Sequence, residues 1–138
     1  KIYGRAGLRI GYGIGHPDFV SALEKVRQPF NTNAVAQAGA MAALDDDAHL
    51  TNTRRTNAVG LKFFESLCAE ERIEFVPSHA NFVMIRVGDG QAVFKALQRH
   101  GVITRPMGGY GLPEWIRLSI GTTAENQRAA EALKAALA

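Results

Sequence analysis

The chain has 138 residues, of which 46% are hydrophobic and 21% are charged, a composition typical of a globular domain rather than a disordered segment. Its formal net charge is +3, but the longest basic run is the pair Arg54–Arg55, so we expect no nucleic-acid partner. No apolar run approaches the ~18 residues that cross a bilayer, and the single cysteine, Cys68, excludes an internal disulfide framework. We therefore expect a soluble, cytoplasmic protein with no membrane partner and with Cys68 packed in its core.

The first half of the chain predicts one short strand followed by three helices. Pro17 suits the first turn of a helix, and Asn33 suits the N-cap of an Ala-rich, buried helix. The acidic run Asp45–Asp47 favours the start of a long helix, because negative side chains stabilise a helix N-terminus. The expected strand covers residues 9–14, and the expected helices cover 17–27, 34–44 and 45–71.

The second half alternates strand and helix patterns, which predicts a small sheet packed against helices. Pro77 and Ser78 separate two strand patterns that favour an antiparallel pair, Gly101 suits the residue after a helix end, and Thr123 can cap the last helix. The expected strands cover 73–76, 82–87, 102–104 and 116–120, and the expected helices cover 91–100 and 123–137. The predicted fold class is α/β, with a small α+β domain at the C-terminus.

The first segment with chemical potential is KIYGRAGLRIGYGIG, in which Arg9 follows Lys1 by eight residues. A lysine can form a Schiff base with a carbonyl cofactor, and an arginine fork matches the oxygens of a phosphate group. Without further information, such a pair is more often two surface charges.

The second segment is RPMGGYGLPEWIRLSIGT, which places Arg105 and Arg117 at the two ends of a loop between predicted strands. Two arginines in this arrangement can converge on one anion. On spacing alone, two solvent-facing charges on edge strands are the more common explanation.

Both segments resemble the fold-type I aminotransferases that use pyridoxal phosphate (PLP), and most of all the histidinol-phosphate aminotransferase family. Lys1 and the run AGLRIGY match the family's lysine and the segment that follows it. The middle segments PFNTNAVAQAGAMAAL and PSHANFVMIR and the ending GLPEWIRLSIGT match as well. The resemblance spans nearly the whole chain but only the last third of such an enzyme. The start at Lys1 instead of Met agrees with a fragment.

The resemblance implies a role for each candidate residue. Lys1 would form the Schiff base with PLP and transfer the proton, and Arg9 would bind the PLP phosphate. Arg117, assisted by Arg105, would bind the phosphate of histidinol phosphate and the carboxylate of glutamate. Asn81 would line the substrate site, although an Asn that closes a turn between two strands is an equally good explanation.

The implied reaction is transamination between L-histidinol phosphate and 2-oxoglutarate, carried out by a homodimer. Two alternatives stay open: an aromatic or other amino-acid substrate, and a noncatalytic fragment, since the family's other cofactor ligands would precede Lys1. The implied domains are the end of a large PLP-binding domain over residues 1–45, a long interdomain helix over 46–71 and a small C-terminal domain over 72–138.

Two rival sites are disfavoured. The glycines of the GYGIG run do not have the spacing of a dinucleotide-binding fingerprint, and no acidic partner follows at the usual distance. The four histidines lie far apart in the sequence, so we expect no metal site.

Overall fold

The structure is a computed structural model that describes residues 2–138. It divides into two compact units, one ending at Thr53 and the other running from Arg54 to Ala138. Each unit is described by itself below. Lys1 lies outside the described residues.

The first unit is helical. It contains the short 3-10 helix η1 (Ala6–Leu8), α1 (Pro17–Val26), α2 (Ala34–Leu44) and the first turns of α3 (Asp47–Glu70). Gly39 of α2 lies close to η1, since a Cβ added at this position would be only 2.8 Å from Leu8 Cδ1. The missing side chain therefore allows α2 and η1 to pack closely. All three helices predicted in this half are present, and their ends differ from the predicted ends by no more than two residues.

The strand predicted over residues 9–14 is wrong. Arg9 adopts a left-handed conformation with φ of 55° at the end of η1, and the residues that follow belong to no strand. A strand is stabilised by ladder hydrogen bonds to a neighbour, and the described part of the first unit contains no other strand that could provide them.

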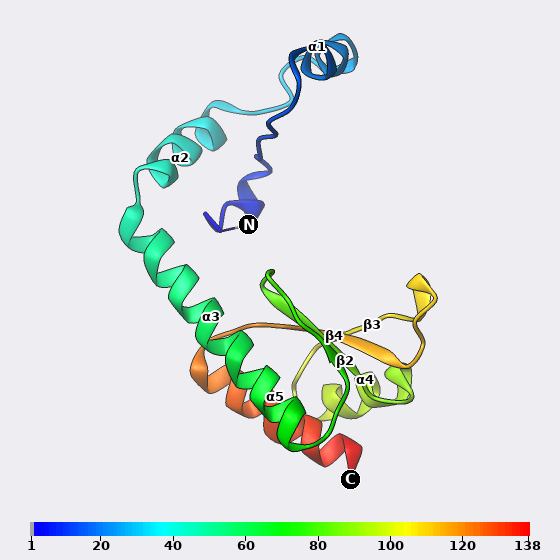
Figure 1. Ribbon diagram of the computed structural model, residues 1–138. Helices are drawn as coiled ribbons and strands as arrows, with labels where there is room; N and C mark the ends of the chain where they lie inside the picture. The colour runs from blue at the N-terminus through cyan, green and yellow to red at the C-terminus, as the bar shows by residue number, and fades with distance from the viewer. Residues whose placement is uncertain (1) are drawn as a thin grey trace. The chain divides into compact units, whose positions relative to one another are not determined.

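The second unit contains a four-stranded antiparallel sheet (Figure 1). Its strands follow the order β1-β2-β4-β3, and neighbouring strands run in opposite directions. Strand β2 pairs along its whole length with β4, with Val83 opposite Leu118 and Ile85 opposite Ile116. The strands are β1 (Phe75–Val76), β2 (Phe82–Arg86), β3 (Arg105–Pro106) and β4 (Trp115–Ser119).

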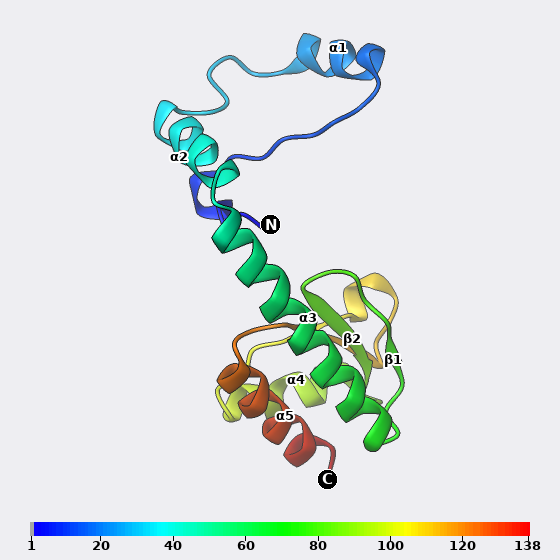
Figure 2. The ribbon, with the colours of Figure 1, turned by 60° about the vertical axis from the view of Figure 1, so that its left-hand side comes forward.

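One face of this sheet is covered by helices, as Figure 2 shows for α3, α4 (Gly90–Arg99) and α5 (Thr123–Leu137). Alternate residues of β2 and β4 point into the core, where they meet apolar side chains from all three helices. The most deeply buried side chains are Phe64, Cys68, Val83, Ile85, Leu97, Ile116 and Leu133. The expected small sheet packed against helices is confirmed, as is the core position of Cys68.

Local signals explain where the helices begin and end. Asn33 caps α2 by accepting a hydrogen bond from the Ala36 amide at 2.8 Å, as predicted. The cap of α5 is Thr122 rather than Thr123, because Thr122 and Glu125 form a reciprocal capping box. Gly101 follows α4 with φ of 72°, a conformation that favours glycine.

No helix within residues 2–138 combines the length and the apolar character that crossing a bilayer requires.

Candidate functional site

Arg105 and Arg117 lie directly opposite each other on the neighbouring strands β3 and β4. Paired positions in an antiparallel sheet project to the same side, and here it is the face that carries Phe82 and Met84 rather than the helix-covered face. The fold thus brings together two cations that are twelve residues apart in the sequence. Arg105 is exposed and lies 3.5 Å from the hydroxyl of Tyr110, whereas Arg117 is half-buried.

The guanidinium of Arg117 stacks on an aromatic ring and has an unused donor. Its Cζ lies 4.9 Å from the centre of the Phe82 ring, a cation–π distance. Its Nε is buried and has no hydrogen-bond partner among the described residues. Because buried donors are normally paired, the hydrogen bonding of this guanidinium is incomplete within the described residues.

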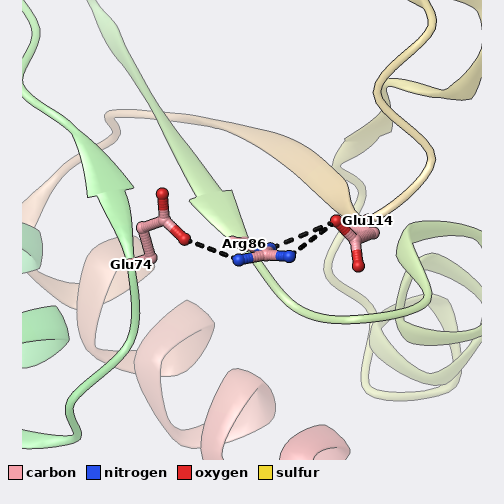
Figure 3. A network of polar contacts seen from close by, with 3 residues as sticks. All are labelled: Glu74, Arg86 and Glu114. Carbon is pink, nitrogen blue, oxygen red and sulfur yellow. Dashed lines mark hydrogen bonds and ion pairs between the residues drawn. The ribbon is translucent and has the colours of Figure 1, made fainter.

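A third arginine on the same face, Arg86, differs from Arg105 and Arg117 because it is paired with carboxylates. Figure 3 shows Arg86 held between Glu74 and Glu114, each with an N–O distance of 2.9 Å. The hydrogen bonds that Arg86 donates to Glu74 and Glu114 raise the pKa of its guanidinium. Among residues 2–138 no carboxylate pairs with Arg105 or Arg117. The charge of Arg86 is therefore neutralised within the fold, and the charges of the other two remain available to an anion.

Asn81 precedes β2 and is exposed. Its main-chain carbonyl accepts a hydrogen bond from the Ile120 amide at 2.9 Å, which ties the start of β2 to the end of β4. Its side chain makes no hydrogen bond within the described part of the chain. The backbone of Asn81 therefore closes the sheet, and its carboxamide is free to contact a ligand.

A shallow, open hollow of about 370 Å³ lies beside this cluster. It shares Phe82 and Met84 with the surroundings of Arg117, since Met84 is the partner of Arg117 in the β2–β4 register. The hollow is lined by Val76, Pro77, Ser78, His79, Ala80, Phe82 and Met84. The sequence reasoning missed Phe82 and Met84, although alternation along β2 could have placed both on the face of Arg117.

Arg9 belongs to the first unit. It is exposed, and its Nη1 donates to the carbonyl of Ala6 at 3.0 Å, which fixes the side chain against η1. No carboxylate among residues 2–138 neutralises it. Its predicted companion Lys1 lies outside the described residues, so the proximity of these two side chains stays a prediction. Within residues 2–138, no group of three histidine, cysteine or acidic residues is placed to hold a metal ion.

Comparison with known families decides what kind of chain this is. The family model of class I and II aminotransferases matches residues 1–133. The chain belongs to the class I and II aminotransferases.

Relatives of this aminotransferase chain carry one recurrent name. Histidinol-phosphate aminotransferase of Akkermansia muciniphila is 49% identical over 137 residues, which are 99% of this chain and 38% of that protein. Histidinol-phosphate aminotransferase 1 of Thiobacillus denitrificans is 51% identical over 138 residues, 100% of this chain and 36% of the relative. The chain thus spans little more than a third of the curated relatives that it matches.

A solved structure agrees with the fold of this aminotransferase chain. The crystal structure of histidinol-phosphate aminotransferase from Sinorhizobium meliloti, in complex with pyridoxal-5'-phosphate, superposes with a TM-score of 0.86 at 31% identity. The match covers 99% of this chain and 39% of that one. The predicted fold class, the C-terminal part of a fold-type I aminotransferase, is therefore confirmed.

Proposed function

We propose that these residues are the C-terminal part of a PLP-dependent histidinol-phosphate aminotransferase. The enzyme would exchange the amino group of L-histidinol phosphate with the keto group of 2-oxoglutarate, giving imidazole acetol phosphate and L-glutamate. The observation that carries the proposal is the half-buried Arg117 with its unpaired Nε, placed opposite Arg105 in a chain of this family. The names of the relatives support the choice of substrate.

The residues present fit an anionic cofactor and an anionic substrate. The exposed guanidinium of Arg9 and the unneutralised guanidinium of Arg117 both suit phosphate or carboxylate oxygens. Lys1 would hold PLP covalently, and Arg9 would bind its phosphate. When bound, PLP supplies an electron sink for the charge left by the departing α-proton. The amine of Lys1 would accept that proton and return it in the 1,3-proton shift that transamination requires.

Arg117 would set the orientation of the substrate. A guanidinium can bind phosphate and carboxylate in the same two-pronged geometry, so one residue can serve both half-reactions. Stacking on Phe82 holds the guanidinium plane in place before the substrate arrives. Arg105 would add a second positive charge, and the free carboxamide of Asn81 a neutral hydrogen bond.

The test is a substitution of Arg117 by lysine, with Arg86→Lys as the matched control. In the whole enzyme that contains these residues, we expect Arg117→Lys to raise KM for both histidinol phosphate and glutamate by about tenfold or more. The reason is that lysine cannot form the bidentate charged contact of arginine. Arg86 already pairs with Glu74 and Glu114, so Arg86→Lys should leave both KM values within about twofold. Equal effects of the two substitutions would contradict the role of Arg117.

Two further outcomes separate the alternatives. Turnover of aromatic amino acids with no turnover of histidinol phosphate would assign the chain to another substrate. An intact mass equal to the 14.9 kDa of these residues, with no turnover of either donor, would mean a noncatalytic fragment.

The proposal extends to the organisation of the whole enzyme. Residues 1–45 would end the large PLP-binding domain, residues 46–71 would form an interdomain helix that includes α3, and residues 72–138 would form the small domain. The enzyme would be a cytoplasmic homodimer, and light scattering of the purified enzyme tests its size.

A further inference from the structure

Asn57 of α3 is connected to the candidate site through a single hydrogen bond. Its Nδ2 donates to the main-chain carbonyl of Ala80 at 3.0 Å, across 23 residues of sequence. Ala80 lies directly before Asn81 and two residues before Phe82, the ring on which Arg117 stacks. The loop that leads into the site is thus attached to the helix at its last residue before Asn81.

The same loop is held at two other points. The Ser78 hydroxyl accepts a hydrogen bond from the Ala80 amide at 3.0 Å, and the Asn81 carbonyl accepts from the Ile120 amide at 2.9 Å. Of these three contacts, only that of Asn57 joins the loop to a helix in the core layer. The loop also forms one wall of the open hollow beside Phe82 and Met84.

The carboxamide of Asn57 is not explained by stability alone. Its Oδ1 is buried and has no partner among residues 2–138, and an unpaired buried acceptor costs free energy. Alanine is also a better helix former than asparagine. Asn57 therefore contributes little to the stability of the helix. Its paired atom, Nδ2, is instead suited to hold the loop through the Ala80 carbonyl.

We propose that Asn57 is a positioning residue for the anion site: through the Ala80 carbonyl it fixes Asn81 and the Phe82 ring, and thereby the guanidinium of Arg117. The inference rests on the proposed function of Arg117 as the anion-binding residue. Asn57 itself touches no substrate. Without the hydrogen bond from Asn57, the loop before β2 is more mobile in the free protein. Part of the binding free energy of the anion is then used to order this loop, and the affinity falls.

The experiment titrates the 138-residue chain with inorganic phosphate and follows the Nε–Hε resonance of Arg117 by NMR. We expect Asn57→Ala to weaken phosphate binding about fivefold, the change that one neutral hydrogen bond accounts for. The variant should keep the fold, because higher helix propensity and loss of the unpaired Oδ1 offset the lost bond. The control is Val93→Ala, which removes buried side-chain volume from α4. It should lower the melting temperature and leave phosphate binding unchanged.

The outcomes keep the two proposals apart. Unchanged binding by Asn57→Ala, or equal weakening by Val93→Ala, would overturn the positioning role. Arg117→Gln identifies the resonance by removing it. Phosphate binding by this variant is therefore followed on the backbone amide resonances of β2 and β4, which pair at Met84 and Arg117, and it should be abolished. If Arg117→Gln binds phosphate like the unmodified chain, the role of Arg117 fails. If Arg117→Gln loses binding and Asn57→Ala does not, only the role of Asn57 fails.

Discussion

Gly60 shows how closely α3 packs against the end of the sheet. A Cβ at this position would overlap Ile120 Cγ2 and would lie 2.7 Å from Asn126 Nδ2. Asn126 in turn accepts a hydrogen bond from the Gly121 amide at 2.9 Å and donates to the Gly121 carbonyl at 3.2 Å. The absence of a side chain at Gly60 therefore allows the helix to approach a hydrogen-bonded turn that follows β4.

We predict that Gly60→Ala destabilises the chain by about 1–3 kcal/mol, because overpacking outweighs the ~1 kcal/mol that alanine gains in helix propensity. Urea unfolding measures the difference. Gly109→Ala is the control, since a Cβ at Gly109 meets no atom within 4 Å. A stability gain in Gly60→Ala would mean that the turn yields easily.

Cys68 predicts a loss of stability at alkaline pH. Its side chain is fully buried, and burial raises the pKa of its thiol to about 11. In the unfolded chain a thiol ionises near pH ~8.5. Between these values the unfolded state loses its proton while the folded state keeps it, so stability is full below pH ~8.5 and falls as the pH rises toward 11.

The measurement is the urea midpoint of the unmodified chain and of Cys68→Ala between pH 8 and 10.5, a range of about two to three pH units around the thiol transition. The unmodified chain should lose more stability across this range than the variant. We also expect the folded thiol to resist thiol reagents at about pH 8, because the thiolate is the reactive form. Parallel pH profiles would rule out the contribution of Cys68.

At the scale of elements, α4 begins at a side-chain cap. Asp89 Oδ1 accepts hydrogen bonds from the amides of Gln91 at 3.0 Å and Ala92 at 2.9 Å. We predict that Asp89→Ala costs about 1 kcal/mol in thermal unfolding, whereas Asp89→Asn keeps most of that amount because asparagine caps equally well. If Asp89→Asn lost as much as Asp89→Ala, the charge rather than the cap would be responsible.

The sequence predicted helices better than strands, and the reason is physical. Caps and prolines act within a few residues, so Pro17 and Asn33 mark helix starts that the structure contains. Strand limits depend on distant partners. The pattern of residues 102–104 predicted a strand, yet β3 forms only at Arg105–Pro106, where β4 provides the pairing residues. The same dependence explains the absence of the strand predicted over 9–14.

The candidate site was predicted in part. Arg105 and Arg117 were named as a pair, and the register places them opposite each other. The neutralisation of Arg86 could not be predicted, because Glu74 and Glu114 lie 12 and 28 residues away from it. Their convergence follows from the strand order, which residue patterns alone do not determine.

At the scale of the whole molecule, the two units differ in how much they bury. Helix α1 has no buried residue, and Phe19 on it is 61% exposed. The second unit buries residues from two strands and three helices in one core. We predict that hydrogen exchange of the 138-residue chain is slowest in β2, β4 and α5 and fast in α1. Mass spectrometry of peptides measures both, and protection of α1 equal to that of β2 would mean that a second molecule covers it.

The order of the strands also affects self-association. The two edge strands, β1 and β3, contain two residues each, and β3 includes Pro106, which has no amide hydrogen to donate. The longer strands β2 and β4 occupy the centre and pair with each other along their whole length, and the outer edge of each is paired at two residues with a short edge strand. Such borders give an incoming strand little to bind, so the folded sheet is poorly suited to seed the cross-β stacking from which fibrils grow.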